Sequence, residues 1–317
     1  GITTDIEATI KEEGEIVVSA KLFLDIVRRL PEEIVFIETD ERMVTYIACG
    51  KVNYQIVGMS SVEYPDLPSF EQTDRITLNA KILRDMIRQT VYAVSENTAK
   101  PIYTGSLYEI EDGVFKIIAI DGYRMAIRSE NVDSESKNRF VVPGKTQHEV
   151  LKLLTDDEEN TEIIIGQRHI TFKIKNYRII SRLIEGTFIE YKSAIPKETK
   201  TEVVINTRTI IDAVERMSLL NNDRIQSPVR CIFSDDEIKL SCTSAVGRAN
   251  DVISVPIIGE SVEIGFNNRY LLDALKNADT DEIKLILNGS LTAMIVKPVK
   301  GDSYLSIVVP MRLANEN

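Results

Sequence analysis

The chain has 317 residues, of which 43% are hydrophobic, and its formal net charge at pH 7 is −11. This length allows more than one hydrophobic core, and no apolar run resembles a membrane span or a secretory signal, so we expect a soluble, cytoplasmic protein. Three cysteines, Cys49, Cys231 and Cys242, lie in apolar strand contexts without metal-ligand spacing. We therefore expect buried, reduced thiols and no disulfide or zinc framework.

A fourteen-residue pattern occurs five times along the chain. Its equivalent positions are 60, 64, 63 and 61 residues apart, at Ser19, Asn79, Pro143, Asn206 and Asn267. So steady a period indicates one folding unit that is used repeatedly. Four of the five lead residues are Ser or Asn, which cap helix N-termini, and apolar residues follow at helical spacing. The pattern predicts five amphipathic helices of about three turns.

Three strand-like runs follow each predicted helix. In the first copy they are Ile34 to Thr39, Met43 to Cys49 and Val52 to Gly58. Short polar breaks of the types that form hairpin turns separate such runs. These breaks are Glu111-Asp112-Gly113, Asp121-Gly122, Lys175-Asn176, Asp235-Asp236 and Asn288-Gly289. The repeating unit is therefore a strand, a helix and three strands, and the fold class is α+β with antiparallel sheets.

Two such units make a domain of about 120 residues, a usual size for one core. Proline and clustered charge near Pro68 and Pro196 place the boundaries, so we expect domains at 1–70, 71–195 and 196–317. Only a strand from Ile2 to Ile10 precedes the first helix, so the first domain is expected to be its second half alone. Either this is natural or about one repeat was removed upstream of Gly1, and the lack of an initiator Met favours removal.

Charge is divided unequally between the predicted elements. The five twelve-residue helical segments together carry +6, which leaves −17 for the remainder. Such an asymmetry steers a polyanion to the helices and away from the sheets. On this basis alone we assign Lys81, Arg84 and Arg88 to DNA contacts, the alternative being solvated surface side chains.

The third position of each helix is basic and the residue four positions later is acidic. The pairs are Lys21 and Asp25, Lys81 and Asp85, Lys145 and Glu149, Arg208 and Asp212, and Arg269 and Asp273. A cation near a helix N-terminus opposes the macrodipole, and this order of the pair is the weaker one. A local rule that is broken five times suggests a use elsewhere. The alternative is a set of solvated helix faces whose similarity was inherited by duplication.

The sequence contains no recognisable arrangement of catalytic residues. The two histidines, His148 and His169, belong to no nucleophile elbow, metal spacing or triad order, and no phosphate-binding glycine loop is present. The acidic run from Asp156 to Glu159 fits a solvated loop. We therefore expect no enzyme, no metal and no cofactor.

Four motifs in order resemble the bacterial sliding clamps, the beta subunits of DNA polymerase III. They are Ile120 to Ala126, similar to Thr-Asp-Gly-His-Arg-Leu-Ala, then Val141 to Lys145, Ile264 to Asn267 and Val309 to Leu313. The resemblance implies a DNA-clamp fold with helices on the inner face and sheets outside, in a head-to-tail homodimeric ring. Such a ring encircles duplex DNA without sequence specificity and is a processivity factor for the polymerase.

The resemblance also implies a pocket that binds short peptides of the Gln-Leu-x-Leu-Phe kind from polymerase, clamp loader and repair proteins. Its expected residues are Tyr103, Ile120, Gly122, Tyr123, Arg124, Met125, Ile189, Ser193, Ala194, Asn267, Tyr270, Leu291, Ala293, Ile307, Val309, Pro310, Met311, Arg312 and Leu313. Tyr123 replaces His, Tyr103 replaces Leu, Ile189 replaces Pro and Ser193 replaces Arg, which leaves the peptide preference open. We expect Arg124 to share one cleft with Met311 and Leu313.

For DNA, the resemblance implies contacts by Asn97, Lys100 and Lys145. For the dimer interface it implies Tyr54 and Ile56 on one side and Leu219 and Leu220 on the other. Two other function classes remain open. One is a peptide-binding adaptor that does not close around DNA because the first domain is truncated, and the other is an enzyme built on β-rich repeats.

Overall fold

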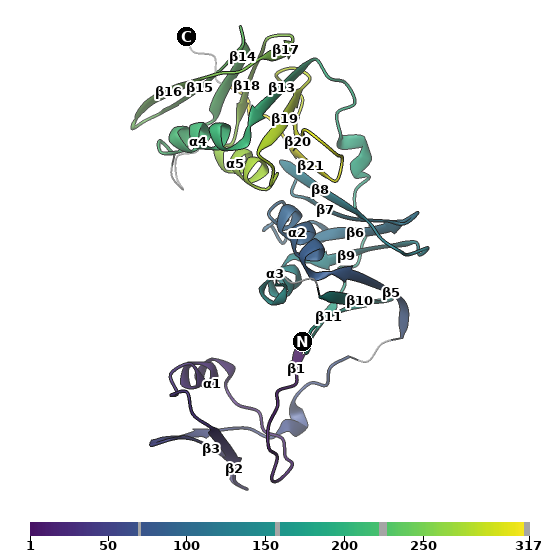
Figure 1. Ribbon diagram of the computed structural model, residues 1–317, viewed down its shortest axis with the longest axis vertical. Helices are drawn as coiled ribbons and strands as arrows, with labels where there is room; N and C mark the ends of the chain where they lie inside the picture. Colours follow the sequence, from purple (N-terminus) through teal and green to yellow (C-terminus); the bar gives the residue numbers. More distant parts are fainter. Residues whose placement is uncertain (69–70, 156–158, 222–226, 314–317) are drawn as a thin grey trace. The chain divides into compact units, whose positions relative to one another are not determined.

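The structure is a computed structural model that describes residues 1–68, 71–155, 159–221 and 227–313. Asp156, Asp157 and Glu158 of the acidic run lie outside the described residues. The chain forms two compact units (Figure 1). The small unit comprises Asp5–Ser69, and the large unit comprises Gly1–Thr4 together with Phe70–Asn317. Both contain antiparallel sheets and helices, as the α+β prediction requires.

Each of the five predicted helices is present and begins directly after its expected lead residue. The helices are α1 (Ala20–Val27), α2 (Ala80–Val91), α3 (Gly144–Leu153), α4 (Thr207–Ser218) and α5 (Asn268–Lys276). The side chains of Asn79, Asn206 and Asn267 accept hydrogen bonds from backbone N–H groups of the first turn. The cap prediction is confirmed at these three positions. The Ser19 side chain makes no cap hydrogen bond, so there the helix starts without it.

The small unit consists of α1, a short 3-10 helix and a three-stranded sheet. The strands are β2 (Val35–Thr39), β3 (Val44–Cys49) and β4 (Val52–Val57), paired in that order, and the 3-10 helix η1 spans Ser61–Glu63. The three predicted runs are therefore confirmed. The buried core of this unit is small and contains Ile26, Ile47 and Ile56.

The strand expected from Ile2 to Ile10 is shorter and lies in the large unit. Strand β1 covers only Ile2–Thr4 and pairs antiparallel with β12 (Tyr177–Arg182). Gly1 and Ile180 exchange two backbone hydrogen bonds of 2.8 Å, which extend this pairing by one residue. The sequence predicted a longer strand, but β1 ends at Thr4, and Ile6 and Ile10 are exposed and belong to no strand.

The large unit contains four further copies of the strand, helix and three strands. The strands of the first two copies are β5 (Gln72–Asn79), β6 (Gly105–Glu111), β7 (Val114–Ile120), β8 (Arg124–Asn131), β9 (Asn138–Pro143), β10 (Asn160–Gly166), β11 (His169–Ile174) and β12. Those of the last two are β13 (Thr201–Asn206), β14 (Val229–Ser234), β15 (Glu237–Ser244), β16 (Gly247–Ser254), β18 (Val262–Phe266), β19 (Glu282–Leu287), β20 (Met294–Pro298) and β21 (Tyr304–Val308). A short strand β17 (Ile257–Gly259) and the 3-10 helices η2 (Pro101–Thr104) and η3 (Tyr191–Ala194) lie between repeat elements.

The first two copies (β5 to β12) and the last two copies (β13 to β21) form the two halves of the large unit. One nine-stranded sheet runs through both halves. Its order is β17-β13-β19-β20-β21-β8-β7-β6-β9, so β21 and β8 join the two halves. In this pair Met125 lies opposite Ile307 and Ile127 lies opposite Leu305. A five-stranded sheet (β1-β12-β11-β10-β5) and a four-stranded sheet (β16-β15-β14-β18) complete the unit. The boundaries at residues 70 and 195 remain predictions.

Four of the five polar breaks form the short hairpin turns that the sequence predicts, whereas Asn288-Gly289 begins a longer loop between β19 and β20. Asp112 and Gly113 both have positive φ, 51° and 73°, as do Asp235 and Asp236 at 54° and 56°. Two central residues with positive φ are what a two-residue hairpin turn of the primed type requires. The short turns keep each strand beside its neighbour and hold the repeat together.

Within the large unit, α2, α3, α4 and α5 lie on one side of the sheets (Figure 1). The α4 and α5 helices contact each other, as do α2 and α3. All three cysteines are buried and free, as predicted, and burial raises the pKa of Cys231 to about 12. Among the helices of the described ranges, none is long and apolar enough to cross a membrane.

Replacing Asn206 with alanine is expected to lower the free energy of unfolding of the large unit by about 1 kcal/mol. The Asn206 Oδ1 accepts a 3.0 Å hydrogen bond from the Thr209 backbone N–H, which alanine cannot replace. The matched control is Asn206→Asp, which keeps the acceptor. Urea denaturation followed by circular dichroism measures both. A loss of equal size in the aspartate variant would contradict the capping role.

Candidate functional site

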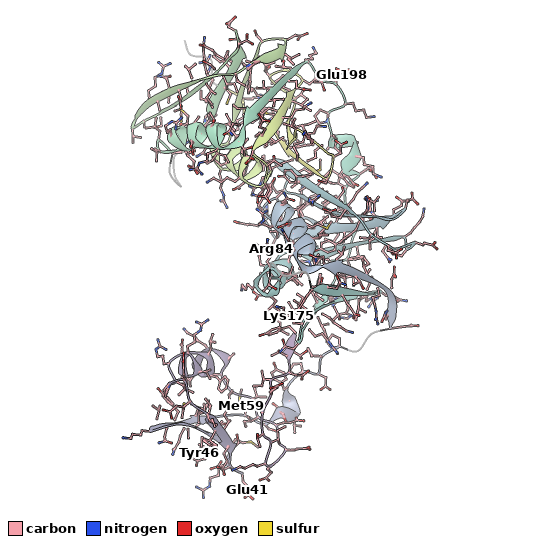
Figure 2. All side chains as sticks on the ribbon, in the orientation of Figure 1. Glu41, Tyr46, Met59, Arg84, Lys175 and Glu198 are labelled. Atoms are coloured by element: carbon pink, nitrogen blue, oxygen red, sulfur yellow. The ribbon has the colours of Figure 1, made fainter. Side chains whose placement is uncertain are left out.

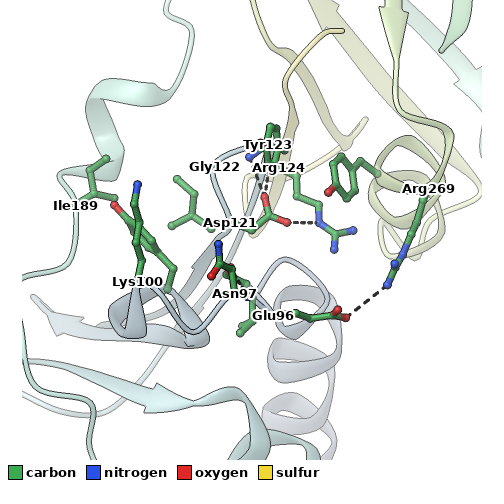
Figure 3. A pocket seen from close by; sticks show the side chains of 14 residues that line it. Glu96, Asn97, Lys100, Asp121, Gly122, Tyr123, Arg124, Ile189 and Arg269 are labelled. Atoms are coloured by element: carbon green, nitrogen blue, oxygen red, sulfur yellow. Dashed lines mark hydrogen bonds and ion pairs between the residues drawn. The ribbon is translucent and has the colours of Figure 1, made fainter. Parts of the chain in front are cut away.

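A pocket of about 560 Å³ opens where the two halves of the large unit meet (Figure 3). Its walls come from the segment that follows α2, the β7–β8 turn, the connector near η3 and the start of α5. The lining residues are Val94, Ser95, Glu96, Asn97, Lys100, Tyr103, Ile120, Asp121, Gly122, Tyr123, Arg124, Ile189, Arg269 and Tyr270. Apolar, aromatic and charged side chains therefore converge on one space, as in a site that holds a ligand in a fixed orientation.

The β7–β8 turn positions the residues at the centre of the pocket. Asp121 Oδ1 accepts hydrogen bonds from the backbone N–H groups of Tyr123, at 2.8 Å, and Arg124, at 3.0 Å. Gly122 has a φ of 96°, which a residue with a side chain rarely adopts. The turn directs Tyr123 outward, with 60% of its surface exposed, while Arg124 is buried.

Arg124 is held by charge and by aromatic rings from both halves of the large unit. Its guanidinium group donates to Asp121 at 2.9 Å and also pairs with Asp273 of α5. It lies over the ring of Tyr270, 4.6 Å from the centroid, and over that of Tyr92, at 5.5 Å. Burial lowers the pKa of Arg124, but the two carboxylates outweigh it and raise the pKa above its ordinary value. The cation is therefore a fixed part of the pocket wall.

Tyrosine hydroxyls connect the two halves behind Arg124. The hydroxyl of Tyr92, at the end of α2, lies 3.0 Å from the Tyr304 hydroxyl and 2.7 Å from the Ser306 hydroxyl. Tyr304 and Ser306 are buried residues of β21, so the Tyr92 hydroxyl lies among buried groups although its ring is partly exposed. Burial raises the pKa of Tyr92 to about 12. On the pocket side, the rings of Tyr123 and Tyr270 stack at 5.9 Å.

Seven of the expected peptide-binding residues line this pocket. They are Tyr103, Ile120, Gly122, Tyr123, Arg124, Ile189 and Tyr270. They come from four separate segments of the chain, and the fold brings them together. Their role in binding peptides remains a prediction.

The other expected peptide-binding residues do not line the pocket. Met125 and Ile307 are buried in the core next to it, and Ala293 packs against the same core. Asn267 caps α5, while Leu291 is exposed. Ser193 and Ala194 belong to η3 and are also exposed.

The final described segment runs past the pocket rather than into it. The Val309 N–H donates to the Tyr123 carbonyl at 2.8 Å, and Met311 forms a bridge with Gly265 of β18. Leu313 also packs near Gly265. Pro310 and Arg312 belong to the same segment, and none of these residues lines the cavity that contains Arg124. Residues Ala314 to Asn317 lie outside the described residues.

The residues assigned to DNA occupy three different settings. Asn97 and Lys100 line the pocket, close to the expected peptide site. Lys81 and Lys145 are exposed in the first turns of α2 and α3. Arg84 and Arg88 are half-buried on α2 and engaged by carboxylates, which the charge pattern alone could not reveal.

Arg84 and Arg88 make ion pairs with named acidic residues. Arg84, labelled in Figure 2, lies on α2, and its Nη2 is 3.4 Å from Asp85 Oδ1. Arg88 pairs with Asp85 at 3.7 Å and with Asp279, which follows α5, at 2.5 Å. Arg88 therefore contributes to the contact between the two halves of the large unit.

The expected pairing of each third-position base with the acid four residues later forms at one helix. Arg208 Nε lies 2.8 Å from Asp212 Oδ1. At the other helices a different base takes the acid: Arg29 pairs with Asp25, Arg84 and Arg88 with Asp85, Lys152 with Glu149, and Arg124 with Asp273. The expectation was wrong there because these bases reach the acid from the adjacent position, from a turn away or from another element. Lys81 and Lys145 have no carboxylate within ion-pair distance in the described part of the chain.

The residues assigned to a dimer interface differ in exposure. Ile56 is buried in the core of the small unit, so its side chain is not available, whereas Tyr54 is exposed on the same edge strand, β4. Leu219, just after α4, is 82% exposed, while Leu220 packs against the core of the large unit.

Sequence reasoning missed several residues of the pocket. Asp121 lies inside a motif that the resemblance uses, and its charge next to Arg124 was an available signal. Arg269 was noted only as a helix base, and Glu96 carried no signal because it lies in a polar loop after α2. Within the described residues, no group of three His, Cys, Asp or Glu side chains could hold a metal ion.

Models of three consecutive domains of the DNA polymerase III beta subunit match the chain. The N-terminal domain matches residues 1–68, the central domain 77–190 and the C-terminal domain 192–312. The beta sliding clamp of Halalkalibacterium halodurans is 34% identical over 310 residues, which cover 96% of this chain and 82% of that protein. That of Bacillus subtilis is 32% identical, with the same coverage of both chains.

Solved structures agree with these matches. A putative DNA polymerase III beta subunit from Eubacterium rectale has a TM-score of 0.93 at 32% identity, covering 98% of this chain and 84% of that one. The sliding clamp of Bacillus subtilis has a TM-score of 0.92 at 32% identity, with 96% and 82% covered. A Pseudomonas aeruginosa clamp bound to griselimycin has a TM-score of 0.90 at 26% identity, with 95% and 82% covered.

The fold and these matches define a processivity factor of DNA replication with the DNA-clamp fold. The chain belongs to the DNA polymerase III beta subunit family, the beta sliding clamps. The expectation from the sequence motifs is thereby confirmed, and the alternative, a peptide-binding adaptor that does not close around DNA, is not favoured.

The pKa of Tyr92 leads to a pH-dependent prediction. An unfolded tyrosine loses its proton near pH 10, whereas folded Tyr92 keeps it to about pH 12. Because the folded pKa is raised, its contribution to stability is complete below pH 10 and is lost as the pH rises toward 12. Tyr92→Phe removes this loss, although it also removes the hydrogen bonds to Tyr304 and Ser306.

The phenylalanine variant should therefore be less stable than the original chain at pH 9. At pH 11 its deficit should shrink by about 1 kcal/mol. Urea denaturation at both pH values measures the difference. A deficit that stays constant between them would show that Tyr92 does not titrate in this way.

Proposed function

We propose that the pocket around Arg124 receives linear peptides from polymerase, clamp-loader and repair proteins, while exposed bases on the helices face the phosphates of duplex DNA. The observation that carries the peptide proposal is the convergence of the pocket lining from both halves of the large unit. A sliding clamp tethers other proteins, and a concave site with apolar walls suits a short peptide better than a flat surface does.

The chemistry of the walls favours an apolar or aromatic anchor. Ile120 and Ile189 supply aliphatic surface, and the rings of Tyr103, Tyr123 and Tyr270 supply broad faces. A buried Leu or Phe side chain gains about 1.5–3 kcal/mol in such a setting. A relative from Pseudomonas aeruginosa was solved bound to griselimycin, so at least one clamp of this fold binds a ligand.

For DNA, the proposal rests on lysines that pair with no carboxylate of the described residues. Lys81 and Lys145 are exposed near the N-termini of α2 and α3, on the side of the large unit where the helices lie (Figure 1). Phosphate contacts position DNA without reading its bases. Weak contacts of this kind suit a protein that must slide, and the acidic remainder of the chain keeps DNA away from the sheets.

We further propose that the protein is a homodimer, that it catalyses no reaction and that it works in the cytoplasm with the replication machinery. β4 and β16 are edge strands of their sheets, and β4 carries the exposed Tyr54. Leu219 adds exposed apolar surface near α4. An edge strand offers unpaired backbone groups to a second chain. We propose that β4 of one copy pairs with β16 of the next.

Lys81→Glu combined with Lys145→Glu is expected to weaken binding to linear duplex DNA. Each lost phosphate contact lowers the slope of log affinity against log salt by about 0.9, so the double variant should lose about 2. Fluorescence anisotropy across a salt series measures this slope. The control combines Lys197→Glu with Lys300→Glu, two exposed loop positions, so it makes the same charge change and should leave the slope unchanged. Equal losses in both proteins would point to net charge instead of a helix face.

Ile189→Ala is expected to weaken binding of a labelled Gln-Leu-Asn-Leu-Phe peptide about fivefold, because it removes about 1 kcal/mol of apolar contact in the pocket wall. Ile258→Ala is the matched control, since Ile258 is an exposed isoleucine on β17 outside the pocket. Both proteins are compared by anisotropy after their folding is verified. Unchanged affinity in Ile189→Ala would place the peptide elsewhere.

A further inference from the structure

One ion pair crosses the mouth of the pocket between the two halves of the large unit. Arg269 Nη2, in the first turn of α5, lies 3.7 Å from Glu96 Oε1, in the segment after α2. Figure 3 shows this pair on one side of the pocket, with Lys100 and Ile189 on the other. The side chains of Arg269 and Glu96 are 68% and 92% exposed, so a ligand can reach both.

The other cations of the pocket lining have different surroundings. Arg124 is buried between two carboxylates and is closed to a further anion. Lys100 Nζ lies 6.0 Å from the centroid of the Tyr103 ring and has no carboxylate within ion-pair distance among the described residues. Arg269 is thus the accessible guanidinium of the lining, and its carboxylate comes from the opposite wall.

The position of Arg269 strengthens its attraction for an anion. It lies at the N-terminus of α5, where the aligned peptide dipoles leave partial positive charge. A guanidinium group also matches the planar carboxylate better than an ammonium does. The ion pair between Arg269 and Glu96 is long and exposed, and such pairs contribute little to stability. A bound peptide can therefore displace Glu96 from Arg269 with a small loss of free energy.

We propose that Arg269 selects peptides that carry an acidic residue beside the apolar anchor. In the protein without a peptide, Glu96 pairs with Arg269 and takes the position that the peptide carboxylate would occupy. This inference rests on the proposed peptide-binding role of the pocket. Glu96 competes with the peptide acid for Arg269 and so moderates the preference. A peptide with a neutral residue at that place leaves the Glu96–Arg269 pair intact.

The test uses fluorescein-labelled Gln-Leu-Asn-Leu-Phe-Asn and a series in which a single Asp replaces each polar position in turn. Affinities for the full chain, Glu96→Gln and Arg269→Gln are compared by anisotropy. At one position, Asp should improve binding to the full chain about two- to fivefold over the neutral residue. The gain should increase in Glu96→Gln and vanish in Arg269→Gln.

Glu260→Gln is the control for the change in net charge. Glu260 is exposed and forms a 3.8 Å pair with Lys200, away from the pocket lining, so its loss should leave every peptide affinity unchanged. An Asp preference that persists in Arg269→Gln, or that is identical in the full chain and Glu96→Gln, overturns the inference. Binding without any Asp preference also overturns it but leaves the peptide-binding role in place. If no peptide binds the full chain, both fall.

Discussion

The pairing of β8 with β21 is the constraint on which the rest of the large unit depends. This ladder makes one nine-stranded sheet from two halves that each contain their own helices and core. β8 begins at Arg124, directly after the β7–β8 turn, so the ladder fixes where the arginine enters the junction. The hydroxyls of Tyr304 and Ser306 lie on the partner strand and meet Tyr92 of the other half. The pocket exists because this ladder holds its two walls together.

Arg124 resolves the main electrostatic problem of the junction. A buried guanidinium is costly unless carboxylates and hydrogen bonds satisfy it, and Asp121 and Asp273 provide both from opposite walls. The arrangement orients the rings of Tyr270 and Tyr92 against the cation. A ligand therefore meets aromatic faces around a cation that two carboxylates already engage, and charge selection depends on exposed groups at the mouth of the pocket, foremost Arg269.

On α2 and α3, some basic side chains pair with an acid of the same helix, whereas the lysine in the first turn stays exposed. On α2, Asp85 is taken by Arg84 and Arg88, which leaves Lys81 of the same helix exposed. On α3, Lys152 takes Glu149 and leaves Lys145 in the same condition. The base at the third helical position is unfavourable for the helix itself, because it opposes the dipole. At Lys81 and Lys145, the lack of a carboxylate partner among the described residues agrees with a role toward a polyanion such as DNA.

The sequence by itself determined the repeat, the five helix starts and the α+β class, because caps, turns and apolar periodicity act over a few residues. Asn206 caps α4 and Asp112-Gly113 turns β6 into β7 for such local reasons. The motif resemblance also identified the family. Only the tertiary structure decided which charged side chains form ion pairs. Arg88 pairs with Asp279, and Glu96 pairs with Arg269, although the partners lie far apart in sequence. Long side chains pair with whichever opposite charge lies near them in space, and the β8–β21 ladder determines which residues of the two halves lie close together.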